Sequence, residues 1–344
     1  MPTKLKSKLI VALFAVAALL ALPAAAQATL AFVRNPLHST VYLANDNGSG
    51  AHKIGSGRNP RVSPDGQLVV YLHEGSGGTP EEMKLALVAG GPSRTLMVNW
   101  QESFYLAFSP DSSAIAALRG PENGARKLVL IDLASGAQRV VASGYFSDFS
   151  FSPDGTELVY SKAGTEHYPS RSDVYRVATS GGKPVRLTHD HNSEDPLWGP
   201  NGEIVFVKLL GASQRRYGPK NELYLMNSNG GQVKRLTHTK VDPLVQGLIP
   251  TAWSASGNQL LAEFGGQDTS YAVTVNPKSG AERTLTKERE SGFIGAALSR
   301  DGTTVLGSTG GFEPAPDHDV ATVPYAGGKL KVLARNAYEP SWSR

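Results

Sequence analysis

The stretch Val62-Ser63-Pro64-Asp65-Gly66 decides the fold, because it recurs along the whole chain of 344 residues. Close copies are Phe108-Ser109-Pro110-Asp111-Ser112 and Phe151-Ser152-Pro153-Asp154-Gly155, and weaker copies begin at Trp198, Trp253 and Leu298. A shortened seventh copy, Trp342-Ser343-Arg344, ends the chain. The first residues of successive copies are 46, 43, 47, 55, 45 and 44 residues apart. A repeat of this period indicates a modular architecture.

Each copy has the chemistry of a tight turn between two strands. Proline presets φ, the aspartate can accept a hydrogen bond from the backbone that follows, and glycine takes a positive φ. A β-rich run follows each turn, as at residues 157–160, and then come a third strand, a Gly-rich turn and a fourth strand, as at residues 174–177 and 184–188. Four short strands in ~45 residues are typical of a β-propeller blade. The sequence therefore predicts an all-β fold.

The two chain ends predict how the ring of blades closes. The N-terminal side offers three strands, at residues 30–34, 40–44 and 52–55, and the C-terminal side offers one, at residues 339–343. Joined in one blade, they leave no open sheet edge. We expect one domain over residues 29–344, a propeller of seven four-stranded antiparallel blades, with six blades as the alternative. Because closure leaves no edge to pair, we also expect a monomer.

The first 28 residues predict a signal peptide. Lys4, Lys6 and Lys8 precede an apolar run at residues 9–22, and Ala26-Gln27-Ala28 supplies the small residues of a cleavage site. This run of 14 residues is shorter than the ~20 of a membrane-spanning helix. We expect cleavage near Thr29, no stable membrane insertion afterwards, and a periplasmic or secreted protein.

Composition excludes several classes of protein. The chain is 40% hydrophobic and 19% charged and has no cysteine, unlike disordered or disulfide-stapled proteins. The net charge of +4 falls to +1 without the three lysines of the signal peptide. We therefore expect no nucleic-acid partner.

The repeat, together with Arg186-Leu187-Thr188 and Arg235-Leu236-Thr237, resembles the WD40-like (PD40) repeats of the TolB family. The resemblance implies a propeller and a role in the cell envelope, where TolB works with the peptidoglycan-associated lipoprotein. TolB carries an α/β domain ahead of its propeller, and we expect that domain to be missing here. Oligogalacturonate lyases have similar repeats and hold a divalent metal with His and Gln side chains. The nearest local match in this chain is Thr188-His189-Asp190-His191.

In a propeller, the loops between second and third strands share one face with the loops that lead to the next blade. These loops are long in this sequence, and we call that side the long-loop face; the Pro-Asp-Gly and Gly-Gly turns form the short-turn face. Functional side chains concentrate in long loops. The candidate binding residues of the long-loop face are His73, Glu74, Trp100, His167, Tyr168, Arg171, His189, His191, Glu194, Asp195, Arg215, Arg216, Tyr217, His238 and Asp242.

Two groups of polar residues suggest a cation such as Ca²⁺ or Mn²⁺. His189 and His191, next to Glu194 and Asp195, point the same way if the segment is extended, and imidazole and carboxylate are common metal ligands. The alternative is an exposed polar loop.

The second group lies three residues before four of the repeat copies, at the channel mouth: Asn59, Asp148, Asp195 and Glu339. These oxygens could hold Ca²⁺. The alternative, which we favour, is that they bind free backbone groups at the strand starts.

Arg215-Arg216-Tyr217 could recognise a carboxylate-bearing partner or an acidic sugar, or could be a solvated loop. The chain has no G-x-S-x-G, P-loop or H-E-x-x-H motif, and no catalytic residue is assigned. The leading hypothesis is a non-enzymatic binding or scaffold module of the cell envelope that recognises a protein or a glycan. The alternative is a metal-assisted polysaccharide lyase or hydrolase.

Overall fold

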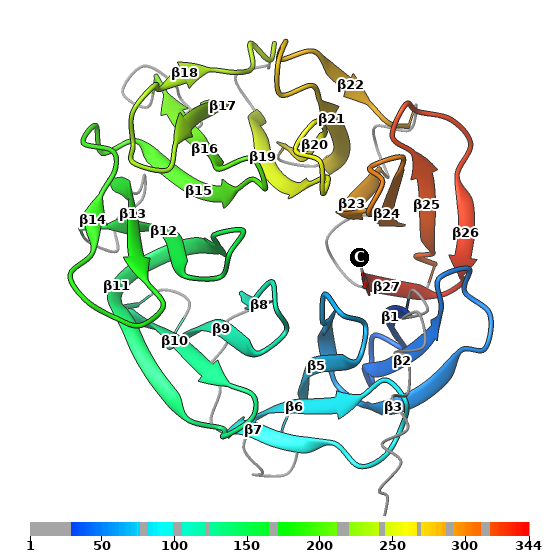
Figure 1. The fold of residues 1–344 in the computed structure, drawn as a ribbon. Helices are drawn as coiled ribbons and strands as arrows, with labels where there is room; N and C mark the ends of the chain where they lie inside the picture. The colour runs from blue at the N-terminus through cyan, green and yellow to red at the C-terminus, as the bar shows by residue number, and fades with distance from the viewer. Residues whose placement is uncertain are drawn as a thin grey trace, which may run out of the picture.

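The computed structural model describes residues 29–73, 75, 81–98, 105–121, 124–164, 171–211, 220–240, 245–266, 270–286, 292–310 and 317–343. The described residues form 27 β-strands, which surround a central axis (Figure 1). Within these ranges no helix is long and apolar enough to cross a membrane. The predicted signal peptide, residues 1–28, lies outside them.

The strands group into four-stranded antiparallel blades. Blade 1 contains β27 (Ala337–Trp342), β1 (Thr29–Arg34), β2 (Thr40–Asn45) and β3 (His52–Ser56). Blade 2 contains β4 (Arg58–Val62), β5 (Leu68–His73), β6 (Glu82–Leu87) and β7 (Arg94–Val98). Blade 3 contains β8 (Leu106–Phe108), β9 (Ala114–Arg119), β10 (Arg126–Asp132) and the first half of β11 (Gln138–Phe151). Blade 4 contains the second half of β11, β12 (Glu157–Ala163), β13 (Ser172–Ala178) and β14 (Val185–Arg186).

The remaining strands complete the ring. Blade 5 contains β15 (Ser193–Trp198), β16 (Glu203–Leu210), β17 (Lys220–Asn227) and β18 (Lys234–Arg235). Blade 6 contains β19 (Val245–Trp253), β20 (Leu260–Gly266), β21 (Ser270–Val275) and β22 (Glu282–Thr284). Blade 7 contains β23 (Phe293–Leu298), β24 (Thr304–Thr309), β25 (Val320–Pro324) and β26 (Lys331–Ala334). Because β11 serves two blades, the strands of the described chain fill seven blades, in agreement with the seven copies of the repeat.

The predicted closure of the ring is confirmed. β27 pairs antiparallel with β1, with Trp342 opposite Leu30 and Ser341 opposite Ala31. The backbone N–H of Thr29 donates to Ser343 Oγ at 2.9 Å, and the Ser343 N–H donates to the Thr29 carbonyl at 3.0 Å. Figure 1 places the C-terminal strand beside the first strands of the chain.

The recurring turn residues form hydrogen bonds with one another and with the backbone of their own hairpin. In blade 4, Ser152 Oγ donates to Asp154 Oδ1 at 2.6 Å and accepts from the Glu157 N–H at 2.9 Å. Asp154 Oδ1 also accepts from the Thr156 N–H at 3.0 Å, and Gly155 has a φ of 72°. Each Ser-x-Asp-Gly turn is therefore a local hydrogen-bonded unit that ends the inner strand and starts the next.

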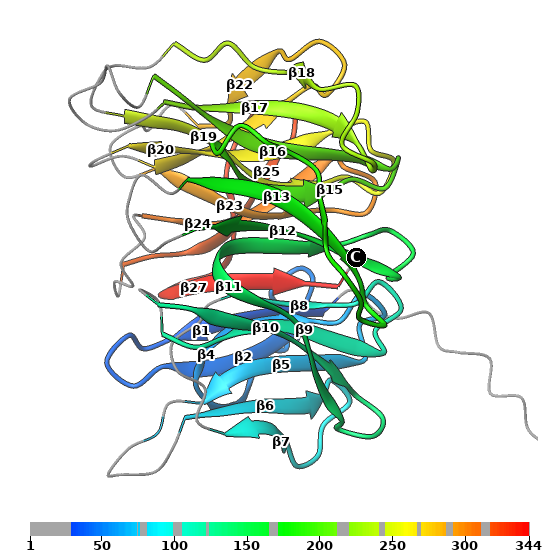
Figure 2. The same cartoon turned by 90° about the vertical axis from the view of Figure 1, so that its left-hand side faces the viewer.

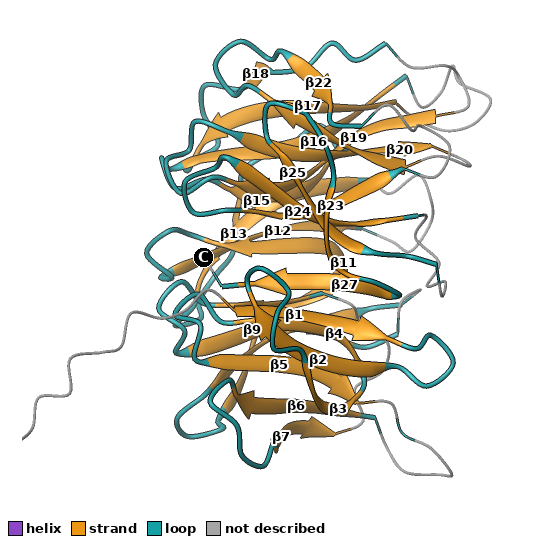
Figure 3. Cartoon of the chain, turned by 90° about the vertical axis from the view of Figure 1, so that its right-hand side faces the viewer, coloured by secondary structure: helices purple, strands orange, loops and turns teal. Residues whose placement is uncertain are grey.

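Apolar side chains fill the spaces between neighbouring blades. Val70 and Leu72 of β5 pack with Ile115 of β9 and Ile131 of β10, for example. Because strand side chains alternate, the first residue of a repeat copy points into this packing, and the residue before it lies on the axis side in blades 2, 5 and 1, at Arg61, Leu197 and Ser341. Figure 2 shows the blades from the side, and Figure 3 shows the hairpin turns of the short-turn face at their left-hand ends.

Candidate functional site: the central channel

The inner strands of the blades enclose a cavity of about 420 Å³ on the axis of the ring. Its lining comes from segments just before each copy of the repeat. The lining residues are Arg61, Tyr105, Leu106, Ala107, Asp148, Phe149, Leu197, Pro250, Thr251, Gly295, Ala296, Ala297, Pro340 and Ser341. All seven blades therefore contribute to one site.

Bulges in the inner strands shape this lining. The register shifts between Arg58 and Arg61 in β4, between Phe146 and Phe149 in β11, and between Glu194 and Leu197 in β15. β19, β23 and the β1–β27 pair shift at the corresponding place. A bulge bends a strand and re-aims its side chains, which is why bulges are frequent beside functional sites.

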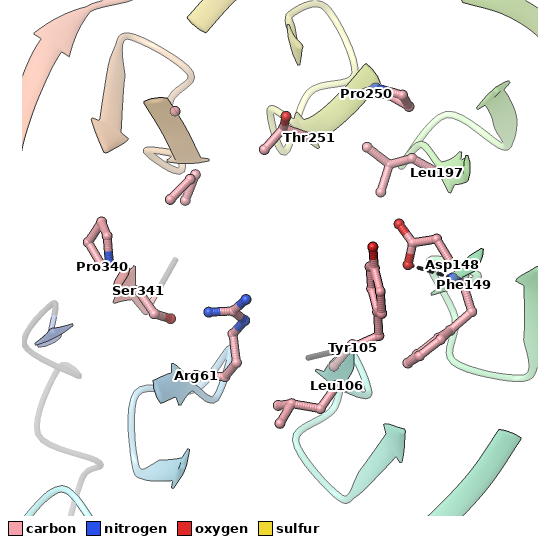
Figure 4. A pocket seen from close by; sticks show the side chains of 14 residues that line it. Arg61, Tyr105, Leu106, Asp148, Phe149, Leu197, Pro250, Thr251, Pro340 and Ser341 are labelled. Atoms are coloured by element: carbon pink, nitrogen blue, oxygen red, sulfur yellow. Dashed lines mark hydrogen bonds between the residues drawn. The ribbon is translucent and has the colours of Figure 1, made fainter. Parts of the chain in front are cut away.

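Three titratable side chains extend into the cavity from blades 2, 3 and 4, and the hydroxyl groups of Thr251 and Ser341 belong to the lining as well. Figure 4 shows the guanidinium of Arg61 on one side and the hydroxyl of Tyr105 with the carboxyl of Asp148 on the other. Tyr105 remains 42% exposed, although it is a large aromatic residue. Much of the remaining lining is apolar, including Leu197 and Ala296. The cavity thus offers a few directed polar groups in an apolar wall, as small-ligand sites do.

The carboxyl group of Asp148 has an unusual environment. Burial inside the ring raises its pKa to about 7, because the charged form loses water, and the hydrogen bond from the Phe149 N–H opposes this only in part. That hydrogen bond, at 2.6 Å to Oδ1, is the dashed line in Figure 4. Asp148 therefore changes charge near neutral pH, as groups at functional sites often do.

The guanidinium of Arg61 is the cation of the lining. Burial lowers its pKa, and the charge of Glu339 opposes that shift. Arg61 Nη1 donates to the Pro60 carbonyl at 3.1 Å. Arg61 is not identified as a site residue from the sequence, although the residues that directly precede the seven repeat copies can be compared with one another. Arginine stands there once, whereas the other copies have Ala107, Ser150, Leu197, Ala252, Ala297 and Ser341.

The four oxygen-bearing residues predicted at the channel mouth bind backbone where the structure shows their partners. Glu339 Oε2 accepts from the Asn59 N–H at 2.5 Å, and Asp148 accepts from the Phe149 N–H. Asn59, Asp195 and Glu339 have φ values of 52°, 47° and 50°, and each precedes a proline. Glu339 and Asp148 thus make backbone contacts of the kind that the alternative describes, and Asp148 also lines the cavity.

The segment between β14 and β15 is not extended, so the premise from which His189 and His191 were expected to point the same way is wrong. His191 has a φ of 57°. Its Nδ1 lies 3.0 Å from Asp173 Oδ2, and its N–H donates to Asp173 Oδ1 at 3.1 Å. His189 is exposed. In the part of the chain that the structure describes, no three His, Asp or Glu side chains form a group that could hold a metal ion.

Asp173 belongs to a structural network that explains the Arg-Leu-Thr motif. Its carboxylate is 2% exposed and accepts from Arg186 Nη2 at 2.5 Å and from Thr188 Oγ1 at 3.1 Å. Blade 5 repeats the arrangement: Glu222, fully buried, accepts from Arg235 Nη2 at 2.9 Å and from Thr237 Oγ1 at 2.8 Å. The arginine and threonine of the motif thus tie the fourth strand to a buried carboxylate of the third strand.

The other candidates divide into described and undescribed residues. Arg171 and His238 are exposed, Glu194 is half-buried and accepts from Ser172 Oγ at 3.5 Å, and His73 Nδ1 lies 2.9 Å from the Ser56 carbonyl. None of these four is among the lining residues of the channel. Outside the described residues lie Glu74, Trp100, His167, Tyr168, Arg215, Arg216, Tyr217 and Asp242.

A second cavity of about 420 Å³ lies between blades 3 and 4 on the short-turn face. Asp111, Asp132 and Asp154 line it. Each of these carboxylates accepts hydrogen bonds from a serine or threonine and from a backbone N–H of its own turn, and each has a lowered pKa for that reason. This cavity is lined by groups that the turns already use, so the central channel is the better candidate site.

Comparison with known proteins supports the fold and leaves the function open. No protein-family model matches the chain. A stretch of 130 residues, 36% of the chain, is 29% identical to the uncharacterized peptidase YuxL of Bacillus subtilis (strain 168). That stretch covers 18% of the relative, so the chain corresponds to a small part of that protein.

Several solved propellers resemble the chain over most of its length. The propeller domain of the Trilobed protease from Pyrococcus furiosus matches with a TM-score of 0.66 at 14% identity, over 90% of this chain and 95% of that one. Oligogalacturonate lyase in complex with manganese gives 0.60 at 16% identity, over 90% and 85%. TolB from Acinetobacter baumannii gives 0.56 at 15% identity, over 91% and 82%. At such identities the likeness shows the fold alone: the chain is a β-propeller, of a form that TolB, proteases and a lyase share.

Proposed function

We propose that this propeller is an exported, non-enzymatic binding module of the cell envelope, which takes its partner at the mouth of the central channel. One observation carries the proposal: Arg61, Tyr105 and Asp148 extend into one cavity from three different blades. Inner strands hold them on a closed ring, so the site is organised before a ligand arrives, which reduces the entropy lost on binding.

The surroundings of His191, a candidate metal ligand, support a binding module over a metal-assisted enzyme. His191 contacts Asp173, which is buried and also bound to Arg186 and Thr188. The likeness to the manganese-bound lyase extends to the fold and is 16% in identity. Binding by the channel accounts for the polar residues of its lining, whereas the lyase alternative has no matching set of described ligands.

Blocking the channel tests the proposed site. Ala296 lines the cavity and is exposed, so Ala296→Trp fills the opening with little effect on the core. We expect this variant to lose capture of its partner from a solubilised envelope fraction while it keeps the wild-type melting temperature. Ala134→Trp, at an exposed turn between β10 and β11, is the matched control and should capture as wild type does. Equal capture by both variants would place the site elsewhere.

Export has its own test. The proposal of a cleaved signal rests on the charged, apolar and small-residue segments of residues 1–28, and β1 begins at Thr29. N-terminal sequencing of the protein isolated from cells should find a chain that starts at or near Thr29, in the extracytoplasmic fraction. A chain that retains residues 1–28 in the cytoplasm would contradict the proposed location.

A further inference from the structure

The lining of the channel carries chemical information about the ligand, and this inference rests on the proposed function. We infer that the channel binds a carboxylate group of a peptide segment, which pairs with Arg61 and is held from the other side by Tyr105 and Asp148. Arg61 lies on β4, Tyr105 immediately before β8, and Asp148 on β11, so the three groups approach the ligand from separate blades.

The first step is the charge of Arg61. A guanidinium inside a protein needs an anionic partner to offset its lost hydration. Among the described residues, none has a carboxylate within salt-bridge distance of Arg61; Glu339 acts on it at longer range and directs Oε2 to the Asn59 N–H. The planar fork of arginine matches a carboxylate in a bidentate pair. A carboxylate ligand bound in the cavity would be the anionic partner of the Arg61 guanidinium.

The second step is the apolar part of the lining, which favours a peptide over a sugar. The apolar lining residues that keep exposed surface are Ala107, Leu197, Ala296 and Ala297. A sugar would bring several hydroxyl groups, each of which needs a hydrogen-bond partner when it leaves water. Apolar peptide side chains gain free energy against such a wall instead. The cavity of about 420 Å³ has room for a short segment of chain rather than a folded domain.

The third step concerns the side of the cavity opposite Arg61. Asp148 in its neutral form can donate a hydrogen bond to a carboxylate, and in its charged form it repels one. Arg61 and Tyr105 are the other titratable groups of the described lining, since the segments from β15, β19, β23 and β27 contribute uncharged residues. Because burial raises the pKa of Asp148 to about 7, the ligand should bind more tightly on the acidic side of neutrality.

Peptide mixtures provide the test. The probes are random pentapeptides without Asp or Glu, prepared once with a free C-terminal carboxylate and once as C-terminal amides, and a third amidated mixture that contains Glu. Retention on the immobilised protein is measured by mass spectrometry at pH 6 and pH 8. We expect carboxylate-bearing peptides to be retained at least ~10-fold more than neutral ones, the value for one charge-assisted pair. The two carboxylate mixtures show whether a chain end or a side chain supplies the group.

Variants of Arg61 decide whether the channel is responsible. Arg61→Gln should abolish the preference for carboxylates, and Arg61→Lys, which keeps the charge without the planar fork, should retain part of it. Arg300→Gln, at an exposed turn of the short-turn face, is the matched control and should behave as wild type. Melting curves show whether each variant is folded. If Arg61→Gln does not fold, Arg61→Lys replaces it as the test of the carboxylate preference.

The pH dependence gives a second measurement. Retention of carboxylate peptides by the wild type should fall by up to ~10-fold from pH 6 to pH 8, and Asp148→Asn should remove this dependence.

Three results would overturn the inference: equal retention of neutral and carboxylate peptides, an unchanged preference in Arg61→Gln, or binding of an oligosaccharide in place of every peptide mixture. If Ala296→Trp still loses the envelope partner in any of these cases, the proposed function stands and the assigned ligand chemistry fails. If Ala296→Trp has no effect on capture, the proposed function fails first.

Discussion

Asp154 and Asp148 lie six residues apart in the same blade, yet their surroundings are opposite. Asp154 sits on the short-turn face, where Ser152, Thr156 and the backbone of the turn donate to its carboxylate and lower its pKa. Asp148 sits in the channel, accepts from the Phe149 N–H and has its pKa raised to about 7 by burial. Folding stabilises the charge of the first carboxylate and destabilises the charge of the second.

The difference between Asp154 and Asp148 reflects two kinds of position in the repeat: turn positions that keep the same residue type in most copies, and channel positions whose residue type varies. Serine and aspartate recur at the turns because each hairpin needs the same local hydrogen bonds, as the pairs of Ser63 with Asp65 and of Ser299 with Asp301 show. Three residues before each copy, the chain has seven positions with different chemistry: Asn59, Tyr105, Asp148, Asp195, Pro250, Gly295 and Glu339. Of these positions, Tyr105, Asp148, Pro250 and Gly295 line the channel, so variation at this place in the repeat changes the chemistry of the cavity.

Removal of β27 should have the largest effect, because this strand serves both regions. Ala337 and Tyr338 are buried against β1 and its neighbours, and Pro340 and Ser341 line the channel. Deletion of residues 337–344 exposes the edge of β1 and removes a buried tyrosine, whose loss alone costs about 3–5 kcal/mol. We expect a fall in melting temperature of roughly 10 °C or more, with aggregation. Unchanged melting would show that the ring does not depend on its closure.

A substitution in a turn should have a smaller effect, confined to stability. Asp154→Ala removes the acceptor for Ser152 Oγ, Thr156 Oγ1 and the Thr156 N–H. We expect the melting temperature to fall by a few degrees because those groups lose their partner, while peptide retention by the folded fraction stays at the wild-type value.

Asp46→Ala is the matched control for the turn. Asp46 is also an exposed aspartate in a hairpin turn, between β2 and β3, outside the Ser-x-Asp-Gly pattern. It should melt as wild type does. A loss of peptide retention in Asp154→Ala at full stability would mean that the short-turn face binds the ligand.

The same contrast explains how far the sequence could be interpreted. Turn chemistry acts within five residues, so the blades and the closing strand could be predicted from Pro64-Asp65-Gly66 and its copies. The conformation around His191 could not, because it depends on Asp173, a buried residue 18 positions earlier. Arg61 was overlooked because the importance of its position appears only when the copies are compared residue by residue along the axis.

The titration of Asp148 should appear as a dependence of stability on pH. A carboxyl whose pKa is about 7 in the folded protein and ~3.9 in the unfolded chain binds its proton more tightly when folded, so stability falls as pH rises from about 4 to about 7. One pKa unit corresponds to about 1.4 kcal/mol, and the partial exposure of Asp148 reduces the total. The turn aspartates have lowered pKa values, so their contribution is lost only below about pH 4 and leaves this range unaffected.

Glu263 allows the two roles of such a carboxyl to be separated. Burial raises its pKa to about 7 as well, but Glu263 lies on β20 and is not among the lining residues of the channel. Asp148→Asn and Glu263→Gln should each flatten the rise in melting temperature between pH 8 and pH 5 by a few degrees, because each removes one carboxyl that folding keeps protonated. Only Asp148→Asn should also flatten the pH dependence of peptide retention. If Glu263→Gln flattened retention equally, the effect would come from stability, and the contrast between the channel and the rest of the fold would not hold.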